Sequence, residues 1–407
     1  MLKRFKTSEY NTSIPQWLFF SLFAFPALPL KLSNLLFILL TVYLFFYWII
    51  YKPSGVLSFL KFNILLAIPF IPYLVEFLFH FENPIMRFEM EKKLLFFIAP
   101  FTMSMYMAVV KPIGFRTCFN VFAGSVLVLS FYTLVVLLFN QVMFQPKSFE
   151  NSAFIFRESF EHVSHLHPTY YGLFATISIL WLVNESVNVS SKWKYVLLLS
   201  LVLLLLLDLL VAAKMPLIIL AIGSVWLIFK NFKQKKKLLI IYILLVTIAA
   251  VSFLFMPSLN NRLQEINANP QTYNYFQNTV VQRQIIFDSN VKVALAHFWT
   301  GTGARNAQFL LDYCYSVMSA GLIEAGKYNS HNQFLSFFVN YGILGLLVFV
   351  ALFVVLVRFS LRYPFGIILI LALGFSMLTE SILERQMGVY LFILSSILIF
   401  NKNTKPE

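Results

Sequence analysis

The sequence is poor in cysteine and in charge. Only two cysteines, Cys118 and Cys314, occur among 407 residues, and charged residues make up 12% of the chain. No metal-ligand spacing is present, and the two cysteines are expected on opposite sides of a membrane. These shortages argue against a disulfide scaffold, a zinc domain and an ordinary soluble protein. We expect no metal and no cofactor.

Long apolar runs are what the sequence has in abundance. They are continuous over helical lengths, whereas the strands of a membrane β-barrel alternate apolar and polar residues. We therefore predict an all-α, polytopic integral membrane protein with a single membrane domain over 1–407. About twelve stretches approach the ~20 residues that cross a bilayer. They are 15–30, 33–51, 62–80, 94–110, 119–140, 168–185, 194–211, 215–231, 238–256, 333–357, 364–379 and 387–400.

Lysine and arginine set the predicted orientation. If the N-terminus, with Lys3, Arg4 and Lys6, lies in the cytoplasm, most basic residues of the short loops fall on the same side, as the positive-inside rule requires. These loops and anionic lipid explain the net charge of +14, so we predict no nucleic-acid partner.

Two predicted external segments collect polar residues. The larger, 257–330, lies between the ninth and tenth predicted spans and has helical patterning around 281–298. The smaller is 145–167. A connection as long as the first usually has a function of its own.

His165 and His167, at the end of the smaller segment, resemble a pair of metal ligands. On a helix, however, residues two apart point in different directions. We therefore favour helix entry and hydrogen bonding for these histidines over metal binding.

Charge also gathers at two predicted outer ends of spans. Lys214 occupies a very short connection before Pro216, and snorkelling explains a lone cation there equally well. Glu380 and Glu384 are four residues apart and so on one helical face, where two carboxylates repel unless a cation lies between them. Arg385 or a basic residue of the long external segment would supply that cation.

The most informative stretch is 331–345, HNQFLSFFVNYGILG. His331 and Asn332 precede an apolar run long enough to span, which puts the imidazole at the border of water and lipid. On one continuous helix His331, Gly342 and Gly345 share a face, where the glycines let another helix approach closely. The simplest interpretation is an interfacial or capping histidine, and the alternative is an active-site group.

This stretch resembles the O-antigen ligase and O-antigen polymerase superfamily, bacterial membrane transferases that use glycans linked to polyprenyl diphosphate. The family pattern is His, then Asn, Ser or Gln, nine residues, Gly, two residues, and Gly, Thr or Tyr. His331, Asn332, Gly342 and Gly345 fit it at every position, after a large external segment as in the family. The resemblance implies catalysis by His331 and structural roles for the other three.

Other parts of the chain resemble the family more loosely. Arg283 resembles a loop arginine associated with the diphosphate, and Lys214 stands where many relatives carry arginine. The segments HPTYYG and TESILERQMG also resemble those of some relatives. The candidate diphosphate-binding residues are therefore Arg283, Lys214, Arg305 and Arg157, and the candidate supporting residues are His167, Glu380, Glu384 and Arg385.

The resemblance implies a reaction as well. A glycosyl diphosphate already carries its leaving group, so the enzyme must deprotonate an acceptor hydroxyl and stabilise the departing diphosphate. Histidine suits the role of general base because its unperturbed pKa of ~6.5 lies near neutral pH. Cationic side chains suit the second task, because they stabilise the negative charge of the departing diphosphate. Direct displacement inverts the anomeric centre and demands no metal.

Several functions share this donor. We expect an O-antigen ligase that moves a glycan from undecaprenyl diphosphate to lipid A core, at the periplasmic face of the bacterial inner membrane and among its lipids. The ligase form of the motif and the late position of the large segment favour it. A polysaccharide polymerase and a protein O-oligosaccharyltransferase remain open, because the motif does not specify the acceptor. A lipid-linked glycan transporter is a separate class, which charged residues deep in several spans would favour.

Overall fold

The computed structural model describes residues 13–110, 114–140, 152–186, 193–211, 213–230, 279–319, 326 and 328–401. All the regular structure in these residues is helical. The helices are α1 (Ser13–Leu22), α2 (Leu30–Tyr51), α3 (Val56–Asn63), η1 (Ile64–Leu66), η2 (Ile68–Phe70), α4 (Ile71–Phe79), α5 (Pro84–Val109), α6 (Phe115–Phe139), α7 (Ser152–Ser164), α8 (Pro168–Ser186), α9 (Lys194–Val211), α10 (Lys214–Lys230), α13 (Thr279–Ala296), α14 (Ala304–Met318), α15 (Gln333–Ser360), α16 (Pro364–Met377), η8 (Ile382–Glu384) and α17 (Gln386–Asn401).

The protein is a polytopic helical membrane protein, as predicted. Among the described residues five helices are long and apolar enough to cross a bilayer, namely α2, α5, α6, α9 and α15. Two bent pairs raise the number to seven if each pair is one span: α3 to α4, bent by 49°, and α7 with α8, bent by 75°. Helices α10, α16 and α17 are apolar but shorter. The full set of about twelve spans stays a prediction.

Two predicted spans are not single helices. In 15–30, helix α1 ends at Leu22, and a series of turns leads to Pro29 at the N-cap of α2. The predicted span 62–80 is divided into short helices around Pro69, because proline lacks the N–H that a continuous helix needs. The predicted span 238–256 lies outside the described residues.

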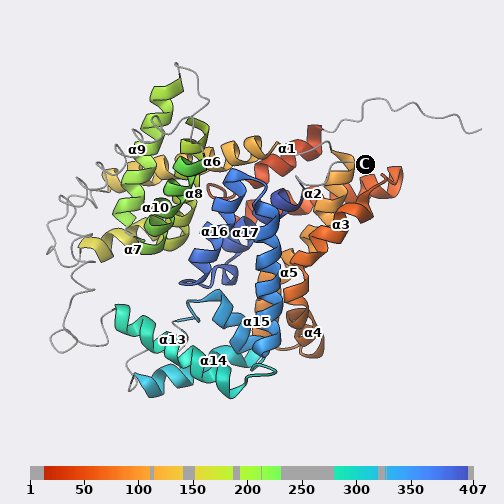
Figure 1. Cartoon of the computed structure of the whole chain (residues 1–407), viewed down its shortest axis with the longest axis vertical. Helices are drawn as coiled ribbons and strands as arrows, with labels where there is room; N and C mark the ends of the chain where they lie inside the picture. The colour runs from red at the N-terminus through yellow and green to blue at the C-terminus, as the bar shows by residue number, and fades with distance from the viewer. Residues whose placement is uncertain are drawn as a thin grey trace, which may run out of the picture.

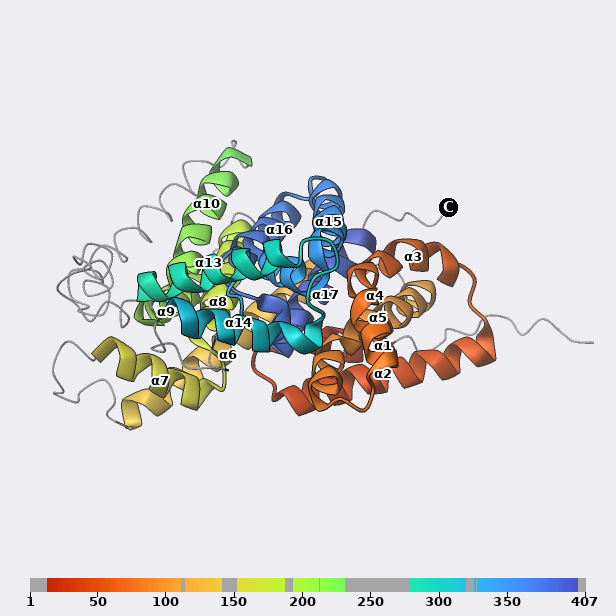
Figure 2. The same cartoon turned by 90° about the horizontal axis from the view of Figure 1, so that it is seen from below.

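The helices gather in three groups (Figure 1). Helices α1 to α5 form one side, α6 to α10 form the other, and α15 to α17 lie between them. Helices α13 and α14 cross one end of the molecule, where α13 packs on α15 and α14 on both α5 and α15 (Figures 1 and 2). Helix α13 matches the helical pattern expected around 281–298.

Aromatic side chains join these groups. Phe25, in the turn between α1 and α2, is 5.8 Å from Phe122 of α6, 5.4 Å from Phe174 of α8 and 5.8 Å from Tyr390 of α17, measured between ring centroids. Buried aromatic pairs of this kind add specific geometry to apolar packing. One ring from the first group therefore contacts helices of the other two groups.

Candidate functional site

Helix α15 starts directly after His331. Asn332 is its N-cap: the side-chain oxygen accepts from the backbone N–H groups of Phe334 at 2.9 Å and Leu335 at 3.0 Å. Two donors that a helix start leaves unpaired are thereby satisfied. The Asn332 amide also donates to the carbonyl oxygen of Leu378 at 3.1 Å. Asn332 therefore fixes the start of α15 against the connection between α16 and α17.

The backbone of His331 is strained. Its φ is 45°, in the left-handed region that residues other than glycine seldom adopt. The backbone N–H of His331 donates to the side-chain oxygen of Asn329 at 3.0 Å. Strain of this kind persists where the surroundings hold it, and it is frequent at functional sites.

Glu380 connects His331 to Arg283 of α13. The Glu380 carboxylate lies 3.1 Å from His331 Nδ1 through one oxygen and 3.2 Å from Arg283 Nη2 through the other. Because an ionised carboxylate only accepts, Nδ1 donates in either charge state of the ring, and in the neutral imidazole Nε2 keeps its lone pair. The side chains of His331 and Arg283 are 26% and 52% exposed, so both remain accessible.

Two opposing effects set the charge of Glu380. Burial by itself would raise the pKa of this carboxyl. The hydrogen bond and charge of His331 and the guanidinium of Arg283 outweigh burial, so the pKa of Glu380 lies below its ordinary value. The group is therefore an ionised acceptor at neutral pH.

The predicted supporting residues lie around this cluster. His167, in the connection between α7 and α8, is close enough to Arg157, Arg385, Glu380 and His331 for their charges to act on its imidazole. Residues far apart in sequence thus share one electrostatic environment. The roles assigned to them stay predictions.

Glu380 and Glu384 do not share a helical face, so that expectation was wrong. Helix α16 ends at Met377, and only the short helix η8 follows. The OH of Tyr170 donates to the carbonyl oxygen of Ile382 at 3.0 Å. Tertiary bonds of this kind replace those of a continuing helix, so the two carboxylates reach different partners.

Glu384 belongs to a second ionic cluster, which the sequence analysis missed. The ammonium group of Lys93 in α5 is 3.2 Å from Glu384 and donates to the carbonyl oxygen of Leu383 at 2.6 Å. Lys92 is 3.6 Å from Glu384 and 2.6 Å from Glu89. The available signal was a run of charge near the start of an otherwise apolar helix.

Helix α15 is interrupted, so the predicted continuous face from His331 to Gly345 was also wrong. Tyr341 and Gly342 have non-helical backbone angles. The carbonyl oxygen of Val339 accepts from the N–H of Thr302 at 2.8 Å, and Ile343 N–H donates to Phe298 at the same distance. The connection between α13 and α14 thus satisfies backbone groups that the break in α15 leaves unpaired.

The motif glycines explain how that connection fits. Gly342 has a φ of 65°, and a Cβ added to it would lie 2.4 Å from the carbonyl oxygen of Trp299. A Cβ on Gly345 would lie 2.6 Å from the Cβ of Tyr341. We expected the glycines to admit another helix; at Gly342 it is instead a loop backbone that approaches.

Glu76 of α4 anchors the same region. Its carboxylate accepts from the backbone N–H groups of Ala304 at 2.8 Å and Arg305 at 3.1 Å, and from the OH of Tyr341 at 3.2 Å. A carboxylate is stabilised at the N-terminus of a helix, here α14. The backbone of Arg305, a predicted diphosphate ligand, therefore belongs to this cap.

Lys214, another predicted diphosphate ligand, begins α10. Its side chain is exposed, and Pro216 lies in the first turn of the helix as expected. Helix α10 packs on α8 and α16. A contact between Lys214 and a diphosphate stays a prediction.

Residues 195–350 match the family model described as O-antigen ligase. Over these residues the chain is similar to the O-antigen ligase family. The match extends from α9 into α15 and includes Arg283 and the whole motif from His331 to Gly345. Glu380 and the cluster around Lys93 lie outside it. A search of curated proteins gives no match.

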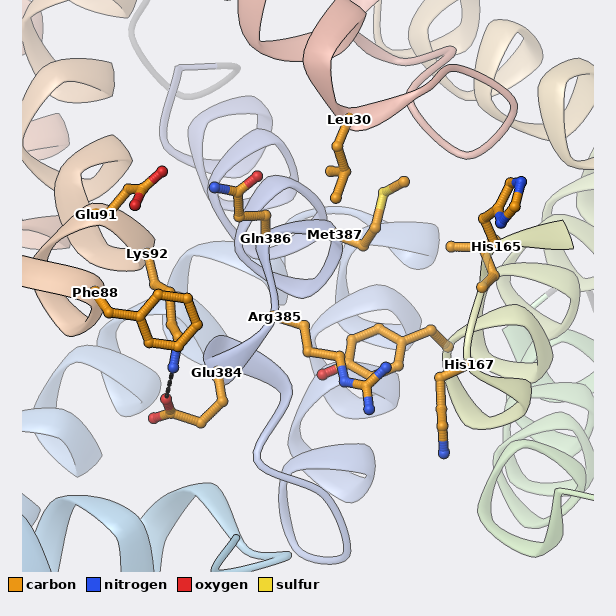
Figure 3. Close-up of a pocket in the computed structure, with 12 residues that line it drawn as sticks. Leu30, Phe88, Glu91, Lys92, His165, His167, Glu384, Arg385, Gln386 and Met387 are labelled. Carbon is orange, nitrogen blue, oxygen red and sulfur yellow. Dashed lines mark ion pairs between the residues drawn. The ribbon is translucent and has the colours of Figure 1, made fainter. Parts of the chain in front are cut away.

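An open pocket of about 290 Å³ lies beside the segment that follows Glu380 in the sequence. It is lined by Leu30, Phe88, Glu91, Lys92, His165, Leu166, His167, Tyr170, Glu384, Arg385, Gln386 and Met387. The starts of α2, α5, α8 and α17 therefore meet around this pocket. Figure 3 shows the residues of α5 on one side, the two histidines on the other, and Arg385 between them.

Proposed function

We propose that this protein is an O-antigen ligase-type glycosyltransferase, which moves a glycan from undecaprenyl diphosphate to an acceptor hydroxyl at the periplasmic face of the inner membrane. The observation that carries the proposal is the series of contacts His331–Glu380–Arg283, within and beside the family-matched segment. It combines a candidate base with a cation at the end of a span.

His331 is the general base of this reaction. Glu380 accepts a hydrogen bond from Nδ1–H and so holds the proton on that nitrogen, which leaves Nε2 free to take the proton of the acceptor hydroxyl. The acceptor oxygen then forms a bond to the anomeric carbon while the bond from that carbon to the diphosphate oxygen breaks. Attack opposite the leaving group inverts the anomeric centre.

Arg283 stabilises the departing diphosphate. Its guanidinium has five N–H donors, and the pair with Glu380 involves Nη2, so donors remain for a phosphate oxygen. Lys214 and Arg157 are additional candidates for the same charge, and Arg305 is a weaker one because its backbone belongs to the Glu76 cap. Negative charge develops on the diphosphate as the bond breaks, so fixed cations lower the barrier.

The test compares His331→Ala with wild type in a strain of the source bacterium that lacks the gene. Loss of a general base typically lowers the rate by ~10²–10⁴-fold, so we expect surface glycan to disappear. His80→Ala removes an exposed histidine outside the site and serves as the matched control. Full rescue by His331→Ala would refute catalysis by this residue.

The same strain distinguishes the acceptors. Lipid A without glycan, together with accumulated long lipid-linked polymer, identifies a ligase. Lipid A bearing a single repeat identifies a polymerase, and loss of glycan from protein identifies an oligosaccharyltransferase. A transporter would leave transfer intact in the His331→Ala variant.

A further inference from the structure

The two residues that follow the motif histidine bond to the chain on either side of Glu380. Asn332 donates to the carbonyl oxygen of Leu378 at 3.1 Å, two residues before Glu380. The side-chain oxygen of Gln333 accepts from the backbone N–H of Leu383 at 2.7 Å, three residues after Glu380. The start of α15 therefore holds the segment that carries Glu380 at both ends.

Gln333 is suited to this contact more than to packing. It is the first residue of α15 and is only 1% exposed. Among the described residues its side-chain nitrogen Nε2 has no hydrogen-bond partner. A buried donor without a partner costs free energy, which an apolar side chain of similar shape would avoid. What a glutamine contributes here is therefore the acceptor for the N–H of Leu383.

Three more helices hold the same turn. Lys93 of α5 donates to the carbonyl oxygen of Leu383 at 2.6 Å, and the OH of Tyr170 of α8 donates to the carbonyl oxygen of Ile382 at 3.0 Å. Side chains thus pair with both backbone groups of Leu383. A Cβ added to Gly388 of α17 would clash with the carbonyl oxygen of Ile382, so that helix also packs closely on the turn. The turn has little room to shift.

The turn in its place sets where the carboxylate of Glu380 lies. The carbonyl oxygen of Glu380 accepts from the N–H of Ile382 at 3.0 Å, so the backbone of Glu380 is bonded to the turn. The carboxylate lies 3.1 Å from His331 Nδ1 and 3.2 Å from Arg283, near the upper end of hydrogen-bond distances. A shift of the turn by about 1 Å away from His331 would therefore break the bond to Nδ1.

We propose that Gln333 is a positioning residue for the transfer reaction. Its bond to Leu383 keeps Glu380 where the carboxylate holds the proton on His331 Nδ1, and Tyr170 supports the same turn from α8. Gln333 acts through Glu380 and not on the reactants. The assignment rests on the proposed transferase function and deepens it, because it names the group that fixes the tautomer of the proposed base.

The tautomer of His331 tests this assignment without turnover. The histidine nitrogens of the full-length protein are isotopically labelled for NMR in detergent, and the signals of His331 are identified by their loss in His331→Ala. At a pH where the ring is neutral, wild type should carry the proton on Nδ1. Gln333→Met keeps the length of the side chain and removes the acceptor, so the share of the Nε2–H form should increase. An unchanged tautomer would overturn the assignment.

Gln386→Met is the matched control. Gln386 is the first residue of α17 and accepts from the Asn34 amide at 3.4 Å, so the same change there leaves the bonds to the turn in place. It should not alter the tautomer, and a change equal to that of Gln333→Met would contradict the assignment. Tyr170→Phe removes one hydroxyl from the turn and decides the question if Gln333→Met folds poorly. The Nε2–H form should again increase, and an unaltered ring would refute the positioning role.

Kinetics separate positioning from stability. Gln333→Met should lower kcat for glycan transfer about tenfold, the worth of one hydrogen bond. In a Glu380→Gln background the same change should have little further effect, because the carboxylate that Gln333 positions is gone. Equal losses in both backgrounds would mean a structural role alone and would overturn the assignment. Transfer by His331→Ala would instead refute the proposed base, whereas loss of transfer in His331→Ala with an unchanged tautomer in Gln333→Met would refute only the positioning role.

Discussion

Glu380 and Glu384 lie four residues apart and do different things. Glu380 contacts His331 and Arg283, which are 26% and 52% exposed. Glu384 contacts Lys93, whose side chain is 0% exposed, and Lys92, which is 16% exposed. We call the first the open cluster, because its cationic partners are exposed, and the second the closed cluster, because Lys93 is buried between α5 and η8, although Lys92 and Glu384 also line the pocket of Figure 3. Two similar charges in one short segment thus have cationic partners of different exposure.

Both carboxyls are ionised, for comparable reasons. Burial would raise the pKa of Glu384, but the charges of Lys93 and Lys92 outweigh it, so its pKa lies below the ordinary value. The same balance holds at Glu380 with His331 and Arg283. Accessibility of the cationic partners, rather than the state of the carboxylate, separates the two clusters.

The largest expected effect comes from breaking the closed cluster. Lys93→Met leaves Glu384 without its closest cation and removes the donor to the Leu383 carbonyl oxygen. Removal of one member of a buried ion pair costs about 3–5 kcal/mol, so we expect a low yield of folded protein and a lower Tm. Thermal unfolding in detergent measures this. Lys61→Met, on an exposed lysine, is the control, and an unchanged Tm in Lys93→Met would show that the closed cluster is not structural.

Breaking the open cluster should lower the activity of the protein without lowering its stability. Glu380→Gln keeps the size of the side chain but no longer fixes the proton on His331 Nδ1, so we expect transfer to fall roughly a hundredfold with a small change in Tm. Glu384→Gln should show the reverse pattern. The measurements are the rate of glycan transfer and the Tm of both variants. Equal losses of rate would contradict the distinction between the two clusters.

The smallest expected effect is on how the Tm depends on pH. Because the pKa of Glu380 is depressed in the folded protein, its stabilisation is complete above the ordinary pKa and is lost as pH falls through the folded value. The difference in Tm between wild type and Glu380→Gln should therefore shrink as the pH falls below the ordinary pKa of a glutamate. A difference that stays constant over this range would mean that the Glu380 contacts do not depend on its charge.

Sequence patterns predicted the helical class, the start of α15 beside His331 and the helix at α13. They offered Arg385 or a basic residue of the long external segment as the cation of the acidic pair. Arg283 of that segment contacts Glu380, whereas the cations beside Glu384 are Lys92 and Lys93. These inferences succeeded because long apolar runs and a spacing motif are local properties of the chain.

Other features depended on distant backbone. The break at Gly342 was not predicted, because it depends on the turn at Trp299 more than forty residues earlier. The separation of Glu380 from Glu384 depends on bonds from Tyr170 and Lys93. A helical pattern records side-chain spacing and does not record which backbone groups find partners elsewhere.

The amino-acid sequence by itself determined that this is a helical membrane protein with a ligase-type histidine motif, since apolar length and residue spacing are written along the chain. Only the tertiary structure decided that Glu380 joins His331 to Arg283, while Glu384 turns to Lys93. The physical reason is that a buried charge must find its partner in space, and the partners lie far away in the sequence, 49 and 97 residues from Glu380 and on helix α5 for Glu384.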